Sequence, residues 1–365
     1  MKPVRILHVF YALGKGGAES RIMDIYREID RNRVQFDFAI HTNDRYFFES
    51  EIESLGGRIY YGMPRYRIAN FLKCRNAWKS FFSDHEYECI HVHALNLAPP
   101  VLSAAKQMGI KWRICHARNS SEISFLRRLS VILFRAFIRR LSTHMFAVSD
   151  LAGRFRFGSG YVVKKNAIQA EQFTYDIAKR EEIRQSLGIQ DSFVLGCVGR
   201  FHGQKNHEFL LEIFADLVKS LPQAVLILIG DGALRPRLEI KISQLGLSDV
   251  IILLGLRDDI PDLLQALDIF LMPSLFEGLP GAALEAQAAG LPCLLSDSIT
   301  SEAKIVDDLV TYLSITNGTK PWVERIVRAA EEPHVRRDTQ ENFIKQGYDI
   351  VDVARWYEEF YIELD

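Results

Sequence analysis

Between residues 271 and 290 the chain reads Leu271-Met-Pro-Ser-Leu-Phe-Glu-Gly-Leu-Pro-Gly-Ala-Ala-Leu-Glu-Ala-Gln-Ala-Ala-Gly290. An apolar run that ends at Met272 is typical of a buried strand, and a short loop that carries Glu277 follows it. Pro280 suits the first position of a helix, and Gly290 suits the residue that ends one. The stretch therefore predicts a strand, a loop and a helix, in that order.

The loop and the first turn of this helix form a candidate binding site. The amides around Gly281–Ala283 lack intrahelical acceptors and face the same space as Glu277, so they attract an anion such as a diphosphate. A carboxylate beside that anion repels it, unless the carboxylate binds something attached to the anion, such as sugar hydroxyls. With Glu285 one to two turns inside the helix, we interpret the stretch as a nucleotide-sugar site. The alternative is a capped turn with two solvated glutamates.

Length and composition indicate an ordinary folded protein with two domains. The chain has 365 residues, of which 48% are hydrophobic and 25% charged, and this composition excludes a disordered chain. Residues 1–165 hold 27 Lys and Arg against 14 Asp and Glu, whereas residues 166–365 hold 18 against 32. The basic half is expected to meet an anionic partner, for which an anionic membrane and a lipid pyrophosphate qualify. No nucleic-acid motif accompanies the charge, so nucleic acid is not a predicted partner.

Cysteine spacing and hydropathy favour a cytoplasmic protein. The five cysteines have no CxxC spacing and are expected to be buried small hydrophobes in a reducing compartment. The first apolar run, Val4–Phe10, is too short for a signal peptide, and no uncharged apolar stretch reaches the ~18 residues that a membrane span needs. We expect the chain to be free in the cytoplasm or peripheral on the inner face of the cell membrane.

Strands alternate with helices along both halves of the chain, which favours an α/β fold of two Rossmann-like domains with parallel sheets and a ligand between them. We expect domains over 1–170 and 171–345, joined near 167–175, and a C-terminal helix within 346–365. The predicted strands are 4–10, 35–41, 57–61, 89–93, 110–115, 146–149, 193–198, 224–229, 250–254, 268–272 and 293–296. The predicted helices include one from about residue 21 and others over 47–55, 206–220, 233–245 and 260–267.

Polar residues follow several of these strands, where ligands collect in parallel sheets. The glycine-rich loop 14–20 allows a ligand to approach the backbone closely. Arg200 and Lys205 follow strand 193–198 and supply positive charge for an anion, unless they are ordinary surface charges before a helix. No DxD element stands at a strand end, so no bound metal is predicted. In the first half, the candidates at or just after strand ends are His91, His93, His116 and Arg118.

Residues 124–141 form a basic amphipathic segment with no acidic residue. At helical spacing, arginines flank an apolar stripe, as in helices that lie on an anionic membrane surface. The alternative is an internal helix whose apolar face is core and whose arginines are solvated. A second basic and aromatic patch, within 64–82, favours the membrane interpretation.

The motifs, taken in order, resemble the family 4 retaining glycosyltransferases of GT-B fold over nearly the whole chain. The resemblance implies two Rossmann-like domains whose parallel sheets face a central cleft, and transfer from a nucleoside diphosphate sugar with retention, without metal or cofactor. A UDP-sugar is favoured and a GDP-sugar is the alternative; the acceptor is a saccharide or a lipid-linked saccharide. Bacterial exopolysaccharide and capsule enzymes look most similar. The motifs are Gly16-Gly17-Ala18-Glu19, His91-x-His93, Gly199-Arg200 with Lys205, Gly230-Asp-Gly232 and Glu277-x7-Glu285.

The resemblance also implies roles for individual residues. The first loop and the Arg200/Lys205 pair hold the diphosphate, beside the loop 298–300. Glu277 bonds donor-sugar hydroxyls, Glu285 the ribose, and His116 orients the donor sugar. The catalytic residues are then His116, Glu277, Arg200 and Lys205. The nucleotide-sugar contacts are Gly16, Gly17, Arg200, Lys205, Arg257, Glu277, Gly278, Leu279, Pro280, Gly281 and Glu285.

The chain departs from the family pattern at two places, and two other hypotheses stay open. Residues 165–169 read Lys-Asn-Ala-Ile-Gln where relatives usually show Asn-Gly-(Ile or Val)-Asp, and Gln204 replaces their Glu or Pro. The relatives' last helix returns to the first domain, and residues 348–360 are suited to this or to a plain terminal helix. The other hypotheses are a GT-B-fold UDP-sugar 2-epimerase, which the Glu277-x7-Glu285 spacing disfavours, and a non-catalytic sugar-nucleotide or membrane-binding module.

Overall fold

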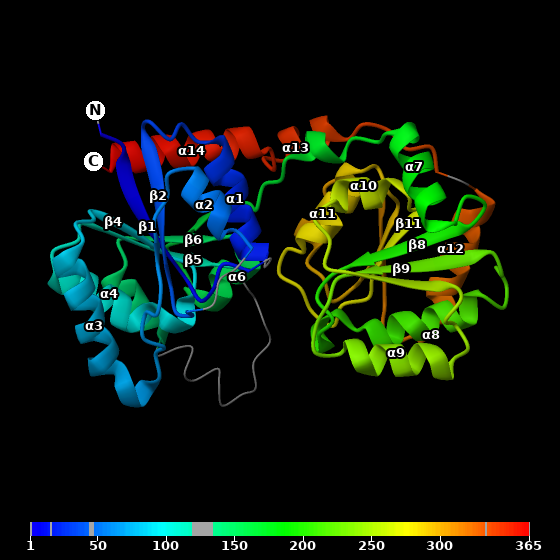
Figure 1. Cartoon of the computed structure of the whole chain (residues 1–365), viewed down its shortest axis with the longest axis horizontal. Helices are drawn as coiled ribbons and strands as arrows, with labels where there is room; N and C mark the ends of the chain where they lie inside the picture. The colour runs from blue at the N-terminus through cyan, green and yellow to red at the C-terminus, as the bar shows by residue number, and fades with distance from the viewer. Residues whose placement is uncertain (1, 15–16, 44–46, 119–133, 333, 365) are drawn as a thin grey trace. The chain divides into compact units, whose positions relative to one another are not determined.

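The structure is a computed structural model, and it describes residues 2–14, 17–43, 47–118, 134–332 and 334–364. The chain divides into two compact units, Met1–Ala167 with Gly347–Asp365, and Ile168–Gln346. From the sequence, the first domain was expected to end at residue 170 and the second at residue 345, each within a few residues of the observed boundaries. Each unit has its own parallel sheet with helices on both faces (Figure 1), which is the Rossmann-like arrangement.

The described part of the first unit has one parallel sheet in the order β3-β2-β1-β4-β5-β6-β7. The order reverses between β1 and β4, which are neighbours in space although β2 and β3 lie between them in sequence. In open α/β sheets, ligands bind beyond the carboxyl ends of the strands at such a reversal. The strands are β1 (Val4–Phe10), β2 (Val34–Ile40), β3 (Ile59–Tyr60), β4 (Cys89–Val92), β5 (Trp112–Ala117), β6 (His144–Ala147) and β7 (Val162–Val163).

Two apolar cores lie on the two faces of this sheet. One core joins the sheet to α1, α2 and the C-terminal helix α14, and the other joins it to α3, α4 and α6. Figure 1 shows α14 in red running beside α1. The helices are α1 (Gly17–Glu28), α2 (Glu49–Ser54), α3 (Phe71–Asp84), α4 (Ala98–Gln107), α6 (Asp150–Arg156) and α14 (Ile350–Glu363), with short 3₁₀ turns η1 (Ile68–Asn70) and η2 (Leu95–Leu97).

Polar contacts fix α14 to the first unit besides its apolar face. The Glu358 carboxylate accepts hydrogen bonds from the Arg33 guanidinium at 2.5 Å and from the Asp30 backbone amide at 2.9 Å. The Tyr361 hydroxyl lies 2.6 Å from Nδ1 of His91, on β4. Residues that are distant in sequence therefore complete this core.

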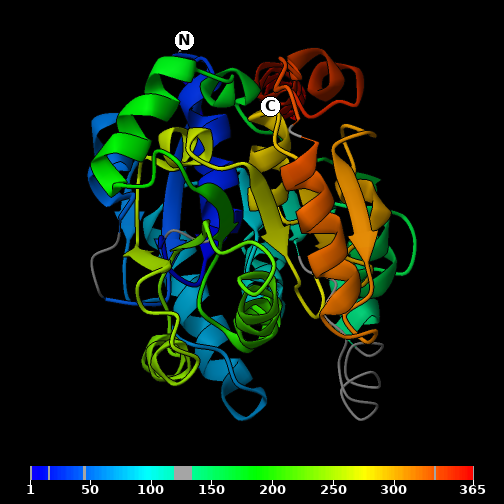
Figure 2. The same cartoon turned by 90° about the vertical axis from the view of Figure 1, so that its right-hand side faces the viewer.

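The described part of the second unit has a parallel sheet in the order β10-β9-β8-β11-β12-β13, which reverses between β8 and β11. Helices α8, α9 and α12 lie on one face and α7, α10 and α11 on the other (Figures 1 and 2). The strands are β8 (Phe193–Val198), β9 (Ala224–Ile229), β10 (Ile251–Gly255), β11 (Ile269–Met272), β12 (Cys293–Ser296) and β13 (Val310–Leu313). The helices are α7 (Ile177–Leu187), α8 (His207–Leu217), α9 (Arg235–Gln244), α10 (Ile260–Gln265), α11 (Gly281–Ala288), α12 (Lys320–Glu331) and α13 (Gln340–Lys345), with 3₁₀ turns η3 (Ala170–Phe173), η4 (Gly203–Lys205) and η5 (Ser301–Ala303).

Several predicted boundaries are corrected by the structure. Helix α1 begins at Gly17, not near Arg21, and β5 extends to Ala117, so His116 lies within the strand and not after it. Pro280 is the N-cap of α11 and not its first residue, because its ψ of 112° is extended. Gly290 ends this helix as predicted, since its φ of 68° is left-handed.

The basic segment 124–141 is described only from residue 134, and residues 134–141 are helical. In this part, Ile138 and Leu141 are buried in the core shared with α3 and α4. Nε of Arg135 donates a hydrogen bond of 2.9 Å to the Phe155 carbonyl in α6. These contacts match the internal-helix alternative, while 124–133 lie outside the described residues. None of the described helices is both long and apolar enough to cross a membrane.

The five cysteines are buried and unpaired, as the sequence predicts. Burial raises the pKa of the Cys115 and Cys197 thiols to about 12. These thiols therefore remain protonated near neutral pH and serve as core side chains.

We predict that Tyr361→Ala destabilises the first unit strongly. The side chain is fully buried, so its removal leaves a cavity and deprives His91 of a polar partner, at a cost of about 3 to 5 kcal/mol. Urea unfolding followed by circular dichroism measures this loss. The control is Arg355→Ala on the exposed face of α14, which should cost less than about 0.5 kcal/mol. Equal, small effects of both changes would show that α14 contributes little to the core.

Candidate active site

In the second unit, the predicted site residues follow the two strands between which the sheet order reverses. The loop with Arg200 and Lys205 leaves the carboxyl end of β8, and the loop with Glu277 leaves the carboxyl end of β11. The sheet therefore brings together two segments that are about 70 residues apart in sequence. This is the position at which parallel α/β sheets bind ligands.

An ion pair joins the two loops. Nζ of Lys205 lies 2.7 Å from a carboxylate oxygen of Glu277, and the two side chains are 18% and 10% exposed. Because both groups are largely removed from water, each one depends on the other for compensation of its charge. The predicted diphosphate-binding cation and the predicted sugar-binding carboxylate are therefore in direct contact.

Backbone contacts hold the two loops in register. The backbone amide of Leu275 donates to the Gln204 carbonyl at 2.8 Å, and the Gln204 side chain donates to the Phe276 carbonyl at 3.0 Å. Asn206, in the left-handed region at φ 55°, donates from its side chain to the Pro273 carbonyl at 3.1 Å. Gln204, where the sequence departs from the family pattern, thus joins the loop after β8 to the loop after β11.

The backbone of Glu277 is also fixed from the other side. It forms an isolated parallel bridge with Ile299, in the loop 298–300 that was expected beside the diphosphate. Gly278, Leu279 and Pro280 then lead into α11. The position of the Glu277 carboxylate is therefore set by backbone contacts on both sides.

Close packing of glycines shapes the loop after β8. A Cβ on Gly230 would lie 2.1 Å from the Gly199 carbonyl oxygen, and its φ of 140° is open only to glycine. A Cβ on Gly232 would lie 2.5 Å from the Phe201 carbonyl oxygen. The predicted Gly230-Asp-Gly232 motif therefore packs directly against the backbone of Gly199 and Phe201, where the Arg200–Lys205 loop begins.

Helix α11 directs its N-terminus toward the same region, and Glu285 lies in its second turn. The amide of Ala283 donates to the Pro280 carbonyl at 3.1 Å, so of the three predicted anion-binding amides this one is occupied. Gly281 and Ala282 keep the positions of helix amides that have no intrahelical acceptor. The anion site at this helix is therefore one amide smaller than the sequence suggests.

Two further predicted contacts differ in their surroundings. Arg200 is exposed. Arg257 follows β10, and its guanidinium is paired with the Asp259 carboxylate at 2.5 Å. The side chain of Arg257 is thus held by a neighbour in its own loop.

Two buried polar side chains, Ser274 three residues before Glu277 and His207 two residues after Lys205, are not predicted from the sequence. The Ser274 hydroxyl and both ring nitrogens of His207 are buried without a hydrogen-bond partner among the described residues. Burial, followed by the charge of Lys205, lowers the pKa of His207 to about 4. His207 is therefore neutral near pH 7 and leaves Lys205 as the buried cation of this region. Neither residue belongs to a motif that would have identified it.

In the first unit, the predicted phosphate loop is described only in part. Gly17 begins α1, and a Cβ on it would meet no atom within 4 Å, so the space beside this helix N-terminus is open. Gly16 lies outside the described residues. His116 is 2% exposed and stacks on the His91 ring at 5.4 Å, which places its ring in the interior of the unit. Its predicted role in orienting the donor sugar stays a prediction.

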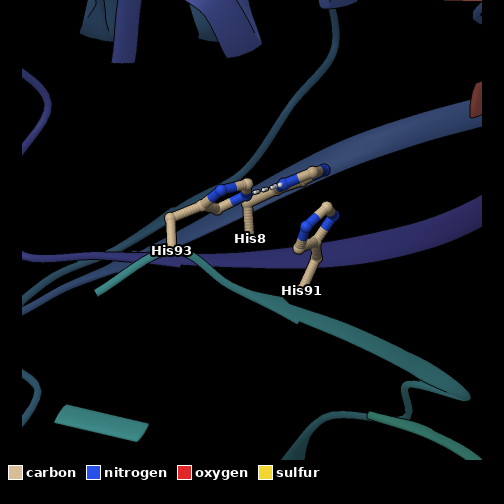
Figure 3. Close-up of side chains that lie close together, drawn as sticks. All are labelled: His8, His91 and His93. Atoms are coloured by element: carbon tan, nitrogen blue, oxygen red, sulfur yellow. Dashed lines mark hydrogen bonds between the residues drawn. The ribbon is translucent and has the colours of Figure 1, made fainter. Parts of the chain in front are cut away.

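Three buried histidines, His8, His91 and His93, lie close together, and one ring nitrogen of each is within 4.8 Å of one ring nitrogen of the other two (Figure 3). Nε of Arg118 donates to Nδ1 of His93 at 3.1 Å, so the proton of His93 must be on Nε2. That proton is then donated to Nδ1 of His8, 3.0 Å away. Nδ1 of His91 lies 2.6 Å from the Tyr361 hydroxyl. Because these hydrogen bonds already use one nitrogen of His91, one of His8 and both of His93, the cluster is better described as a hydrogen-bonded pair beside His91 than as a metal site.

Burial lowers the pKa of each of these histidines well below its ordinary value, and the Arg118 charge adds to this effect. The three rings are therefore uncharged at neutral pH. His91 and His93 are predicted from their position at a strand end, whereas His8 lies inside β1 and is not predicted. Pairing of His8 with His91 in the β1–β4 register could have revealed its place.

Comparisons with known proteins identify the family. Residues 179–349 match the family described as glycosyl transferases group 1. Over 357 residues the chain is 36% identical to the putative glycosyltransferase EpsF of Bacillus subtilis (strain 168), covering 94% of this chain and 93% of that protein. The chain belongs to the group 1 glycosyltransferases. It is thus an enzyme that transfers sugars, which sets aside the epimerase and the non-catalytic hypotheses.

A second relative and a solved structure add detail. The chain is 27% identical over 295 residues to the UDP-Gal:alpha-D-GlcNAc-diphosphoundecaprenol alpha-1,3-galactosyltransferase of Escherichia coli, over 76% of each chain. The structure of Anabaena HepE in complex with UDP matches with a TM-score of 0.74 and 18% identity, over 100% of this chain and 96% of that chain. The predicted GT-B fold class is confirmed.

We predict that Gly230→Ala disrupts the second unit, because the new methyl group would overlap the Gly199 carbonyl oxygen. The expected loss is at least about 2 kcal/mol in the free energy of unfolding, measured by urea titration. Gly203→Ala is the matched control, since a Cβ there meets no atom within 4 Å. If Gly230→Ala unfolds with the same free energy as the wild type, the close approach of the Gly230 and Gly199 backbones is contradicted.

Proposed function

We propose that this glycosyltransferase moves a sugar from a UDP-sugar to a lipid-linked saccharide, with retention and without a metal, in the synthesis of a cell-surface polysaccharide. The observation that carries the proposal is the Lys205–Glu277 ion pair at the strand ends where the second sheet reverses. A GDP-sugar is the alternative donor, and a free saccharide the alternative acceptor. The UDP complex of HepE and the UDP-Gal and diphosphoundecaprenol in the name of the Escherichia coli relative support the choices made.

The charges of the second unit suit a departing diphosphate. As the bond between the anomeric carbon and the phosphate oxygen breaks, negative charge grows on the diphosphate. Lys205, Arg200 and the N-terminus of α11 offer positive charge for it, and such preorganised stabilisation is the largest kind of catalytic contribution. Glu277 binds hydroxyls of the donor sugar, and Glu285, in the second turn of α11, binds the ribose.

A simple proton balance completes the proposed reaction. The acceptor hydroxyl forms the new bond to the anomeric carbon on the side that the diphosphate leaves, and its proton passes to the departing phosphate oxygen. No protein base is then required. Glu277 is occupied by Lys205 and sugar hydroxyls and does not act as the nucleophile of a double displacement.

The proposed membrane contact is peripheral, on an anionic surface. In the described part of segment 124–141, Arg139 and Arg140 are exposed, whereas the apolar residues Ile138 and Leu141 belong to the core. We therefore expect attraction between charges to dominate over insertion of this helical part. Binding to anionic vesicles should then weaken steeply with salt.

We predict that the two ion-pair residues differ in their effect on the binding of plain UDP. Lys205→Met removes a diphosphate-binding cation and should weaken UDP at least about tenfold, which is 1.4 kcal/mol or more. Glu277→Gln removes a repelling carboxylate and frees Lys205, so UDP should bind at least as tightly as to the wild type. Isothermal titration with UDP measures both. Lys219→Met, a change of an exposed lysine after α8, is the control and should leave the affinity unchanged.

With a UDP-sugar and acceptor, both variants should lose at least about a hundredfold in kcat/KM, because the pair then acts on the leaving group and on the sugar. Retention is read from the anomeric configuration of the product by NMR. Weakened UDP binding in Glu277→Gln would show that the carboxylate contacts the nucleotide and not the sugar. An inverted product would overturn the retaining mechanism.

A further inference from the structure

The first unit has a cavity of its own where its sheet order reverses. It measures about 360 Å³ and is lined by Tyr11, Arg65, Tyr66, segment 93–97, Arg118 and Arg156. Tyr11 directly follows β1, and segment 93–97 directly follows β4, the two strands between which the order changes. The cavity therefore occupies the ligand-binding position of this sheet.

The cavity is strongly basic. Its described lining holds three arginines and no carboxylate. A neutral saccharide would find one side-chain amide there, that of Asn96, and no carboxylate among the described lining residues. An anionic group with several oxygens suits this lining.

Arg118 lines this cavity, and one of its donors has no partner among the described residues. Nη1 of this arginine donates to the Asn166 side chain at 3.0 Å, and Nε donates to His93 at 3.1 Å. Nη2 is buried and has no hydrogen-bond partner among the described residues. Burial lowers the pKa of Arg118 to about 10, so the group is still charged at neutral pH. A buried cation with an unpaired donor at a cavity is a sign of a missing anion.

The two other arginines occupy different surroundings. The Arg65 guanidinium is exposed and lies over the Tyr11 ring at 5.4 Å, a contact that holds it beside the cavity. Arg156, at the end of α6, is partly buried, and burial lowers its pKa. Together with Arg118 they give the lining three guanidinium groups, so an anion in the cavity would meet three positive charges.

An apolar strip continues from the cavity to the surface. The ring of Tyr66, which lines the cavity, contacts Phe71 at 6.1 Å between centroids, and Phe71 contacts Phe137 at 6.1 Å. In the same segment as Tyr66 and Phe71, Ile68 and Leu72 are 82% and 61% exposed. A strip with this much exposed apolar surface next to a basic cavity matches a ligand that has an anionic head and a hydrocarbon chain.

We propose that this cavity binds the diphosphate of a polyprenyl-linked acceptor, with the hydrocarbon chain along Tyr66, Ile68, Phe71, Leu72 and Phe137. The proposal rests on the proposed function and deepens it by assigning the acceptor's charged group to residues of the first unit. Arg118 would supply the buried contact, and Arg65 and Arg156 the contacts nearer to solvent. The donor nucleotide would have a separate site, on the second unit.

The test measures binding of farnesyl diphosphate to the full chain by isothermal titration, below the micelle-forming concentration of the lipid. The wild type should bind it at least about tenfold more tightly than inorganic pyrophosphate, which lacks the chain, and farnesol, which lacks the charge. The double variant Arg65→Ser/Arg156→Ser should lose at least about tenfold in affinity. The matched control is Arg67→Ser/Arg154→Ser, which removes two neighbouring exposed arginines outside the cavity lining and should retain wild-type affinity.

A second titration separates this proposal from the donor assignment. Farnesyl diphosphate should bind the wild type with the same affinity when UDP is saturating. Displacement by UDP would overturn the proposal, because the cavity would then serve the nucleotide. Equal losses in the two double variants would also overturn it, since general surface charge would explain the binding. Failure of UDP to bind the wild type at all would instead contradict the proposed function.

Discussion

The Lys205–Glu277 ion pair is the interaction on which the proposed chemistry depends. Two largely buried charges of opposite sign stand at the ends of neighbouring parallel strands, and neither is stable there without the other. The surrounding backbone is fixed by Gln204, Asn206 and the bridge to Ile299. A lysine has three donors, so Lys205 can keep Glu277 as a partner while it turns toward a phosphate oxygen. The Lys205 ammonium is therefore available to a phosphate, and Glu277 compensates its charge before a ligand binds.

The two units differ in the partners that they give to a buried cation. The second unit pairs the Lys205 cation with the Glu277 carboxylate, which the proposed function assigns to the hydroxyls of the donor sugar. In the first unit, the Arg118 guanidinium donates to two neutral acceptors, His93 and Asn166, and one of its donors has no partner among the described residues. The difference agrees with the charge of the chain, which is basic in its first half and acidic in its second. A charged donor and a charged acceptor would then be bound by separate sets of cations.

Local sequence patterns were sufficient for much of the fold. Strands β8, β9 and β12 begin and end at the predicted residues, because their uninterrupted apolar runs are bounded by turn residues. The helix after Glu277 was placed within one residue at its start, since Pro280 and Gly290 mark its limits. Strand β13 and helix α12 were not predicted, although Trp322 of α12 is fully buried in the core of the second unit.

The site was less accessible to sequence reasoning, because its contacts join residues far apart in the chain. Lys205 and Glu277 were each named, but their direct contact follows from the strand order, which no local pattern encodes. The pairing of Tyr361 with His91 depends on where the last helix packs. The proton positions in the pair of His8 and His93 depend on a single donor, Arg118. Tertiary packing decides each of these contacts.

The most direct measurement is a crystal structure of the chain soaked with a UDP-sugar in which a fluorine at C2 of the sugar slows transfer. The expected density places diphosphate oxygens within about 3 Å of Lys205 Nζ and beside the N-terminus of α11, with the sugar hydroxyls on the Glu277 carboxylate. Nucleotide density at another location, with Lys205 and Glu277 still paired and out of contact with the ligand, would contradict the assignment of this ion pair as the centre of the donor site.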